Sequence, residues 1–65
     1  DDDPLVFYRA IAQWASRFLA PDGIGLVEIN EALGAGTADV FRDAGFRAGV
    51  LKDLSGRDRV VRFCR

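Results

Sequence analysis

The stretch 23–30 constrains the fold of this chain more than any other part of the sequence. Its apolar side chains are those of Ile24, Leu26, Val27 and Ile29, and turn-forming residues stand on both sides. A short, nearly continuous apolar run between turn residues is typical of a strand buried on both faces. Because the flanking segments have helical patterns, we expect a strand of the parallel type with helices packed against it.

The segment before this strand is predicted to be an amphipathic helix. Asp3-Pro4 is a typical helix start, and Pro21 disfavours helical geometry at the residue before it. Apolar side chains recur at spacings of three and four in between. The side chains expected in the core include all four aromatic residues of the segment: Phe7, Tyr8, Trp14 and Phe18.

After the strand, the pattern predicts a second helix over 33–44, with Gly45 in left-handed geometry just beyond its end. Two strands follow, over 46–52 and 59–64. The turn between them holds Gly56, which supplies any positive φ that the hairpin needs, and two aspartates that we expect to cap backbone N–H groups, Asp53 and Asp58. The predicted order is therefore helix, strand, helix, strand, strand.

Connection lengths then restrict the sheet. The helix between the first two strands allows a right-handed crossover between parallel strands, whereas the short turn makes the last strand antiparallel to its predecessor. Slotting the last strand between the other two buries its apolar residues best. We therefore predict an α/β fold, αβαββ, with a three-stranded mixed sheet and both helices on one face. The outer edge of strand 24–29 stays uncovered, so self-association through that edge is expected.

Several functions are excluded by composition. The 65 residues contain no histidine, which rules out Ser-His or Cys-His catalysis and His-ligated metal. The single cysteine, Cys64, has no internal disulfide partner, which favours a reducing, cytoplasmic location. No apolar run approaches the roughly 18 residues of a membrane span, so no membrane partner is expected.

Charge is distributed unevenly along the chain. Residues 1–41 carry two basic and seven acidic side chains, a net charge of −5, and residues 42–65 carry seven basic and three acidic ones, a net charge of +4. The bland interpretation is that arginines line the solvated side of edge strands. The alternative is a small free-standing module that uses its basic C-terminal hairpin to bind RNA or an acidic protein.

Few residues are candidates for a functional site. Glu28 is a carboxylate inside an apolar strand, which either pairs with an arginine of the last strand or sits at the carboxyl end, where α/β sheets hold their ligand crevice. Asn30 closes the same strand. The glycines Gly34 and Gly36 do not complete a nucleotide-binding fingerprint, because the position of a third glycine is Asp39.

Three segments in this order resemble a known family. They are Asp3-Pro4-Leu5-Val6-Phe7-Tyr8-Arg9-Ala10-Ile11, then Leu19-Ala20-Pro21-Asp22-Gly23 leading into Leu26-Val27-Glu28-Ile29, and Lys52-Asp53-Leu54-Ser55-Gly56-Arg57-Asp58-Arg59-Val60-Val61. The chain is similar to the C-terminal part of the release-factor glutamine methyltransferases of the HemK/PrmC type. The similarity covers essentially all of 1–65, which is expected to be one unit without an internal boundary. The chain departs from the common pattern at Leu33 and Gly36.

The resemblance implies a fragment of a Rossmann-like class I methyltransferase with strand order 3-2-1-4-5-7-6, of which this chain supplies 5, 7 and 6. It implies that the parent enzyme uses S-adenosylmethionine to methylate the glutamine side chain in the GGQ loop of peptide-chain release factors. The glycine-rich and Asn-Pro-Pro-Tyr motifs of that family do not occur here. We therefore assign no catalytic, cofactor-binding or metal residue and expect the fragment to be inactive without the rest of its domain. Only Glu28 and Asn30 are candidates for the rim of the active site.

Overall fold

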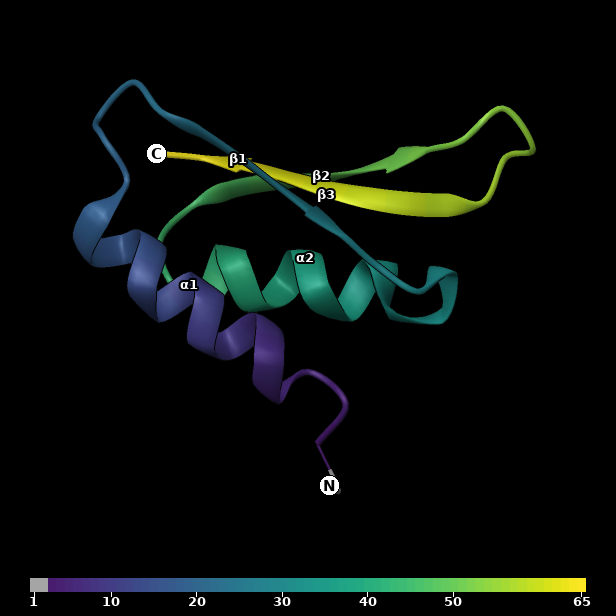
Figure 1. The fold of residues 1–65 in the computed structure, drawn as a ribbon, viewed down its shortest axis with the longest axis horizontal. Coiled ribbons are helices and arrows are strands. Elements are labelled where there is room, and N and C mark those ends of the chain that lie inside the picture. The colour runs from purple at the N-terminus through teal and green to yellow at the C-terminus, as the bar shows by residue number, and fades with distance from the viewer. Residues whose placement is uncertain (1–2) are drawn as a thin grey trace.

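Across residues 3–65, which the computed structural model describes, the elements follow the predicted order (Figure 1). Their bounds are α1 Val6–Phe18, β1 Ile24–Glu28, the 3-10 helix η1 Glu31–Leu33, α2 Gly34–Asp43, β2 Arg47–Lys52 and β3 Asp58–Cys64. The starts of the two helices show the clearest differences from expectation, and the other boundaries shift by one or two residues. The first helix begins two residues after Pro4, and a 3-10 turn precedes the second helix.

The last strand lies in the middle of the sheet, as predicted. The strand order is β1-β3-β2, and both neighbouring pairs are antiparallel. The sheet is therefore antiparallel and not mixed as predicted, because the two strands that run in the same direction do not pair with each other. Val61 of β3 lies opposite Val27 of β1 on one side and Val50 of β2 on the other. The two outer strands therefore run in the same direction without touching each other, as the predicted crossover requires.

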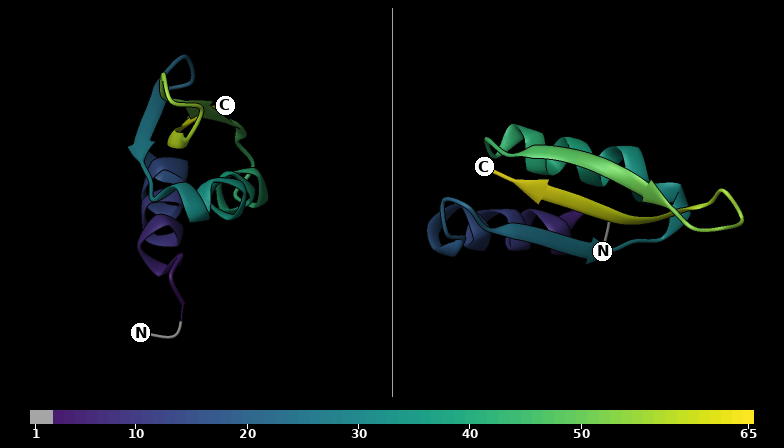
Figure 2. Two further views of the ribbon diagram at one scale, coloured as in Figure 1. Left: turned by 90° about the vertical axis from the view of Figure 1, so that its right-hand side faces the viewer. Right: turned by 90° about the horizontal axis from the view of Figure 1, so that it is seen from above.

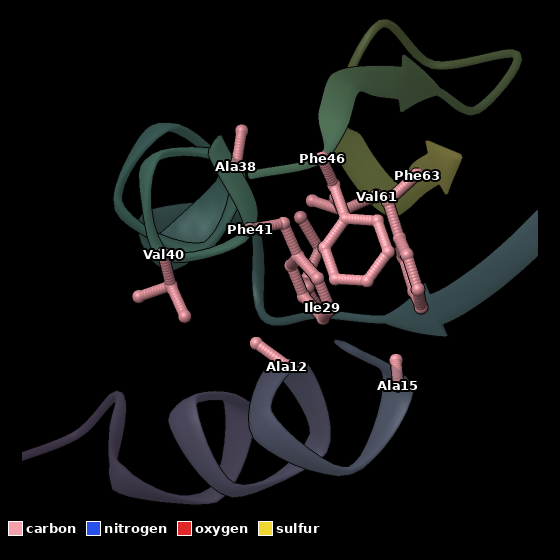
Figure 3. Packing of buried hydrophobic residues seen from close by; sticks show 9 residues of the cluster. All are labelled: Ala12, Ala15, Ile29, Ala38, Val40, Phe41, Phe46, Val61 and Phe63. Carbon is pink, nitrogen blue, oxygen red and sulfur yellow. The ribbon is translucent and has the colours of Figure 1, made fainter. Parts of the chain in front are cut away.

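Both helices cover the same face of the sheet, and the core lies between them and the strands (Figures 1 and 3). Phe41 of α2 is fully buried and stacks on Phe63 of β3, with ring centroids 4.0 Å apart. Phe46 packs edge-on against Phe63 at 5.2 Å. From α1, Ala12 and Ala15 point into this cluster. The opposite face of the sheet, called the outer face below, is covered by no element of residues 3–65.

The end of α2 shows why the chain turns back into the sheet. Gly45 has a φ of 97°, as predicted for the residue after the helix. Its N–H donates to the carbonyl of Arg42 at 3.0 Å, and the N–H of Phe46 donates to the carbonyl of Phe41 at 3.0 Å. These are the paired hydrogen bonds of a Schellman motif, which satisfies the last carbonyls of a helix.

The end of α1 is capped by a residue far away in the sequence. The Arg65 guanidinium donates to the carbonyls of Ala15, Ser16 and Leu19 at distances of 2.9 to 3.2 Å. It also lies 5.5 Å from the ring centroid of Phe46. A cation at the carboxyl end of a helix is favoured by the helix dipole. Arg65 thus joins the end of β3 to the end of α1.

The hairpin is built largely as expected. Gly56 has a φ of 81°, and the Asp53 carboxylate accepts hydrogen bonds from the backbone N–H groups of Ser55 and Arg57 at 2.9 and 3.1 Å. Asp58 differs from the prediction, because its carboxylate accepts a hydrogen bond from Lys52 and forms an ion pair with it. The pair closes the base of the hairpin.

Two burial predictions are wrong. β1 is buried on one face only, and Ile24 and Leu26 on its outer face are 56% and 64% exposed. Of the four aromatic residues expected in the core, only Tyr8 packs against it. Phe7, Trp14 and Phe18 are 66%, 61% and 62% exposed. The physical reason is the same in both cases, since the described elements form only one helical layer and one sheet.

Candidate functional site

The carboxyl end of β1 carries the first candidate residue, Glu28. It is the last residue of β1, lies opposite Val60 and has an exposed side chain. Its backbone carbonyl accepts a hydrogen bond from the Tyr8 hydroxyl at 2.9 Å, which ties α1 to this end of the sheet. Within residues 3–65 no ion pair joins Glu28 to an arginine of the last strand. Of the two predicted alternatives, the ion pair does not form among these residues, and Glu28 lies at the carboxyl end of its strand.

Asn30 lies just beyond β1 and has a structural task. Its side-chain oxygen accepts a hydrogen bond from the N–H of Ala32 at 3.0 Å and so caps η1. An open hollow of about 210 Å³ lies beside it, lined by Asn30, Glu31, Arg57 and Arg59. Glu28 is not one of the lining residues. The fold therefore brings Asn30 close to two arginines of the hairpin.

Asp53 forms an ion pair with Arg59, one of the residues that line this hollow. Besides the N–H groups of the turn, its carboxylate accepts a hydrogen bond from Arg59 at 3.0 Å. The N–H of Arg57, followed by the Arg59 guanidinium, lowers the pKa of Asp53 below its usual value. The ion pair with Asp53 offsets the charge of Arg59, whereas Arg57 forms no ion pair within residues 3–65.

The described part of the chain has little of the chemistry that a complete active site needs. Between residues 3 and 65 no three His, Cys, Asp or Glu side chains are grouped so that they could hold a metal ion. Asp1 and Asp2 lie outside the described residues. Cys64 is a free thiol, half-buried at the end of β3. None of the helices in this range is both long and apolar enough to cross a bilayer.

Most basic side chains of the C-terminal part are used inside the fold. Arg42, Arg47, Lys52, Arg59 and Arg65 all donate to carboxylates or backbone carbonyls of the same chain. Of the seven basic residues after position 41, Arg57 and Arg62 make no side-chain hydrogen bond among the described residues. The hairpin is thus not a cluster of free cations, and nothing in the geometry favours the RNA-binding alternative.

Apolar groups gather on the open side of β1 instead. We call the free side of this strand, away from β3, the β1 edge; its residues are Ile24, Leu26 and Glu28. The side chains of Ile24 and Leu26 lie on the outer face of the sheet beside this edge. The aromatic flank is formed by Phe7, Trp14 and Phe18, which recur every seven or four residues along α1 and hence share one side of it.

The two surfaces lie on the same side of the molecule. The other flank of α1, with Arg9, Ala12 and Gln13, borders α2 in a hollow of about 260 Å³. Because the aromatic flank lies on the opposite side of α1, it faces away from α2. β1 forms the sheet edge farthest from β2, above α1 (Figure 2). The β1 edge and the aromatic flank together form a candidate interaction surface on the described chain.

Comparisons with known proteins identify relatives of the chain. It is 48% identical over 60 residues, 91% of its length, to a release factor glutamine methyltransferase of Cereibacter sphaeroides. It is 38% identical over 95% of its length to the protein of that name from Flavobacterium psychrophilum, and 39% identical over 94% to that from Bacteroides thetaiotaomicron. No family model matches the chain, and no solved structure matches it significantly.

These similarities place the chain in a methyltransferase family, with which its α/β fold is compatible. By sequence it is similar to part of the release factor glutamine methyltransferases. The chain spans about a fifth of the length of these relatives, 22% in each case, a share consistent with the C-terminal fragment expected from the sequence.

Proposed function

We propose that the chain is the C-terminal segment of an S-adenosylmethionine-dependent protein-glutamine methyltransferase that acts on the GGQ-loop glutamine of peptide-chain release factors. The observation that carries the proposal is the 48% identity to a protein named for this activity, over 91% of the chain. The segment supplies the last three strands and two helices of a Rossmann-like domain. A cytoplasmic location belongs to the same proposal and rests on the lone Cys64.

The shape of the sheet supports a segment of a larger domain. Within residues 3–65, nothing covers the outer face of the sheet or the β1 edge. The side chains of Ile24 and Leu26 on this side are more than half exposed. Isolated domains rarely leave a long apolar edge strand open, because it is a template for pairing. The remainder of the methyltransferase domain is the proposed occupant of this surface in the parent enzyme.

Cofactor binding is assigned to the remainder of the enzyme. S-adenosylmethionine supplies an electrophilic methyl group and carries a positive charge on its sulfur. The glycine-rich cofactor motif of the family does not occur among the 65 residues. We therefore place the cofactor site outside this chain and derive no catalytic step from it. Glu28 and Asn30 are proposed to border the active site at the carboxyl end of β1.

A chimeric enzyme tests the proposal. In the Cereibacter sphaeroides relative, the matching segment is replaced by this chain, and methyl transfer to the glutamine of a GGQ-loop peptide is followed by mass spectrometry. We expect methylation at a rate within about tenfold of the parent, a difference of about 1.4 kcal/mol in the activation barrier. A folded chimera that binds S-adenosylmethionine but leaves the peptide unmethylated would overturn the proposal.

Calorimetry on the isolated chain tests the claim that it is inactive. Titration with S-adenosylmethionine is expected to give no binding heat, with the chimera as the positive control. Micromolar affinity of the isolated chain would contradict the assignment of the cofactor site to the remainder of the enzyme. The variant Asn30→Ala in the chimera measures the contribution of the proposed rim, with Ser55→Ala at the exposed hairpin tip as a matched control.

A further inference from the structure

The hairpin turn and the carboxyl end of β1 lie at the same end of the sheet. Glu28, the last residue of β1, pairs with Val60 near the start of β3. Lys52, the last residue of β2, pairs with Asp58, where β3 begins. Both outer strands therefore end beside the start of β3, and the turn projects beyond that end (Figure 2). The hollow of about 210 Å³ beside Asn30 is lined from both sides, by η1 and by the hairpin, and so lies at the proposed rim of the active site.

Three polar groups of this hollow have no partner within residues 3–65. The Arg57 guanidinium and the Glu31 carboxylate both line the hollow and are exposed, yet neither forms an ion pair among these residues. The third group is the side-chain nitrogen of Asn30, whose oxygen already accepts a hydrogen bond from the N–H of Ala32. The hollow therefore offers free donors from Arg57 and Asn30 and a free acceptor from Glu31.

The main chain on both sides of the hollow is held by hydrogen bonds. On the hairpin side, the Asp53 carboxylate accepts from the backbone N–H of Arg57 at 3.1 Å and from the Arg59 guanidinium at 3.0 Å. On the other side, Asn30 caps η1 and so fixes the chain at Glu31, the first residue of that helix. Groups that are positioned before a ligand arrives lose less conformational entropy on binding. The hollow is thus suited to bind a ligand without a rearrangement of the hairpin.

The charges around the hollow cancel, which indicates the kind of ligand. Arg59 is paired with Asp53, and Arg57 and Glu31 have opposite charges. A carboxylate or phosphate would be attracted by Arg57 but repelled by Glu31. A neutral group that has both a donor and an acceptor satisfies the two side chains together, and the peptide group of a main chain is such a group. The volume of about 210 Å³ is several times that of one water molecule, about 30 Å³, so a peptide group has room there.

From these observations we infer that the hollow binds a main-chain peptide group of the protein substrate, near the glutamine that is methylated. Arg57 donates to the peptide carbonyl, Glu31 accepts from the peptide N–H, and Asn30 supplies a second donor. The inference rests on the proposed function for the identity of the substrate, and it deepens that function by assigning residues that recognise main chain. These residues bind and orient the substrate and take no part in the methyl transfer.

Peptide binding to the chimera tests the inference without relying on catalysis. A fluorescently labelled GGQ-loop peptide is titrated with the chimera in the absence of S-adenosylmethionine, and anisotropy gives the dissociation constant. We expect Arg57→Ala and Glu31→Ala each to raise this constant about fivefold. Both side chains are exposed and unpaired within residues 3–65, so the variants should remain folded. Arg17→Ala, an exposed arginine in the last turn of α1, is the matched control and should leave peptide binding unchanged.

A conservative variant distinguishes a peptide group from an anion. Glu31→Gln keeps an acceptor oxygen and should bind the peptide within about twofold of the unmodified chimera. If the hollow binds a carboxylate or phosphate instead, Glu31→Gln removes a repulsion and tightens binding. Tighter binding by Glu31→Gln would therefore overturn the inference.

Backbone changes in the peptide supply the most local measurement. An ester in place of one amide removes a single N–H. We expect one position near the glutamine at which the ester weakens binding to the unmodified chimera but not to Glu31→Ala. The absence of such a position, unchanged binding in Arg57→Ala and Glu31→Ala, or a chimera that binds no peptide overturns the inference. A chimera that binds the peptide as expected but transfers no methyl group overturns the proposed function alone, so the two failures are distinguishable.

Discussion

The two outer strands of the sheet differ in how far charged side chains and caps protect their free edges. On β2 the arginine of the neighbouring helix, Arg42, donates to the outward carbonyl of Ala48 at 2.9 and 3.2 Å. On β1 the outward residues before Glu28 are Ile24 and Leu26, and no charged side chain lies among Ile24 to Val27.

This difference indicates at which edge the sheet continues into another strand. An edge strand that faces water is usually short, charged or capped, because its open N–H and C=O groups otherwise recruit other strands. β2 begins with Arg47, ends with Lys52 and is capped in between by Arg42, whereas on β1 the charge and the Tyr8 cap are confined to Glu28 at its end. The chain therefore ends the sheet at β2 and leaves it open at β1. The same direction follows from the strand order 5-7-6 that the family resemblance implies, in which β1 is the strand nearest the rest of the domain.

Glycine substitutions in the two outer strands should separate them most clearly. A Cβ on Gly25 of β1 would lie 2.0 Å from the ring of Phe63, whereas one on Gly49 of β2 would meet nothing within 4 Å. We expect Gly25→Ala to lower the free energy of unfolding by about 3 kcal/mol through overpacking. Gly49→Ala should change it by no more than about 0.5 kcal/mol. Urea unfolding of both variants measures the two values, and equal losses would show that the Phe63 contact does not decide the effect.

The next largest effect concerns the helix beneath β1. Arg65→Ala removes hydrogen bonds to three carbonyls at the end of α1 and is expected to cost about 1.5 kcal/mol of unfolding free energy. Arg62→Ala, in the same strand, should cost less than about 0.5 kcal/mol, because its side chain makes no hydrogen bond among the described residues. Thermal unfolding compares the two. A loss from Arg62→Ala as large as that from Arg65→Ala would contradict the capping role.

Opening the β2 edge tests the comparison from the other side. Arg42→Ala frees the carbonyl of Ala48 and removes the ion pair with Asp39. We expect a loss of about 1 kcal/mol in stability. We also expect concentration-dependent association in sedimentation, because the free carbonyl of Ala48 leaves the β2 edge open to pairing. Arg42→Lys is the intermediate case, with one donor group in place of the planar fork. An unchanged size distribution for Arg42→Ala would show that β2 is protected by another feature.

The smallest effect is on the pH dependence of stability. The pKa of Asp53 is lowered in the folded chain, above all by the N–H of Arg57. Its stabilising contribution is therefore complete above the unfolded pKa of about 4 and is lost as the pH falls through the lower folded pKa. Asp53→Asn should make the melting temperature fall less between neutral pH and about pH 3. Asp22→Asn, in an exposed turn, is the control, and equal acid dependence in both variants would contradict the assignment.

Much of the fold was predictable because its determinants are local. The spacing of apolar residues located the helices and strands, and Gly45 and Gly56 marked the two positions of positive φ. Connection lengths gave the strand directions, and burial of its apolar residues placed β3 in the centre. The spacing of apolar residues does not show which part of a protein covers each apolar side chain. Leu26 and Trp14 have the sequence pattern of buried residues, yet they are buried only if something beyond residues 3–65 covers them.

The candidate site was less predictable for a related reason. Glu28 and Asn30 were found from their place at the end of an apolar strand. Their neighbours come from distant segments, since Tyr8 reaches Glu28 and two hairpin arginines lie beside Asn30. Long side chains that cross between elements leave no periodic signal in the sequence. Arg65 is the clearest example, because its carbonyl partners lie 46 to 50 residues earlier.

The central position of β3 also governs the order in which the chain can fold during synthesis. Both ladders of the sheet use residues 58–64, and the two outer strands do not pair with each other. A growing polypeptide that has reached the hairpin turn therefore contains the helices of this segment but none of the strand pairings described here. Loss of residues 58–65 would remove all of these pairings at once, so it would be far more damaging than its length suggests.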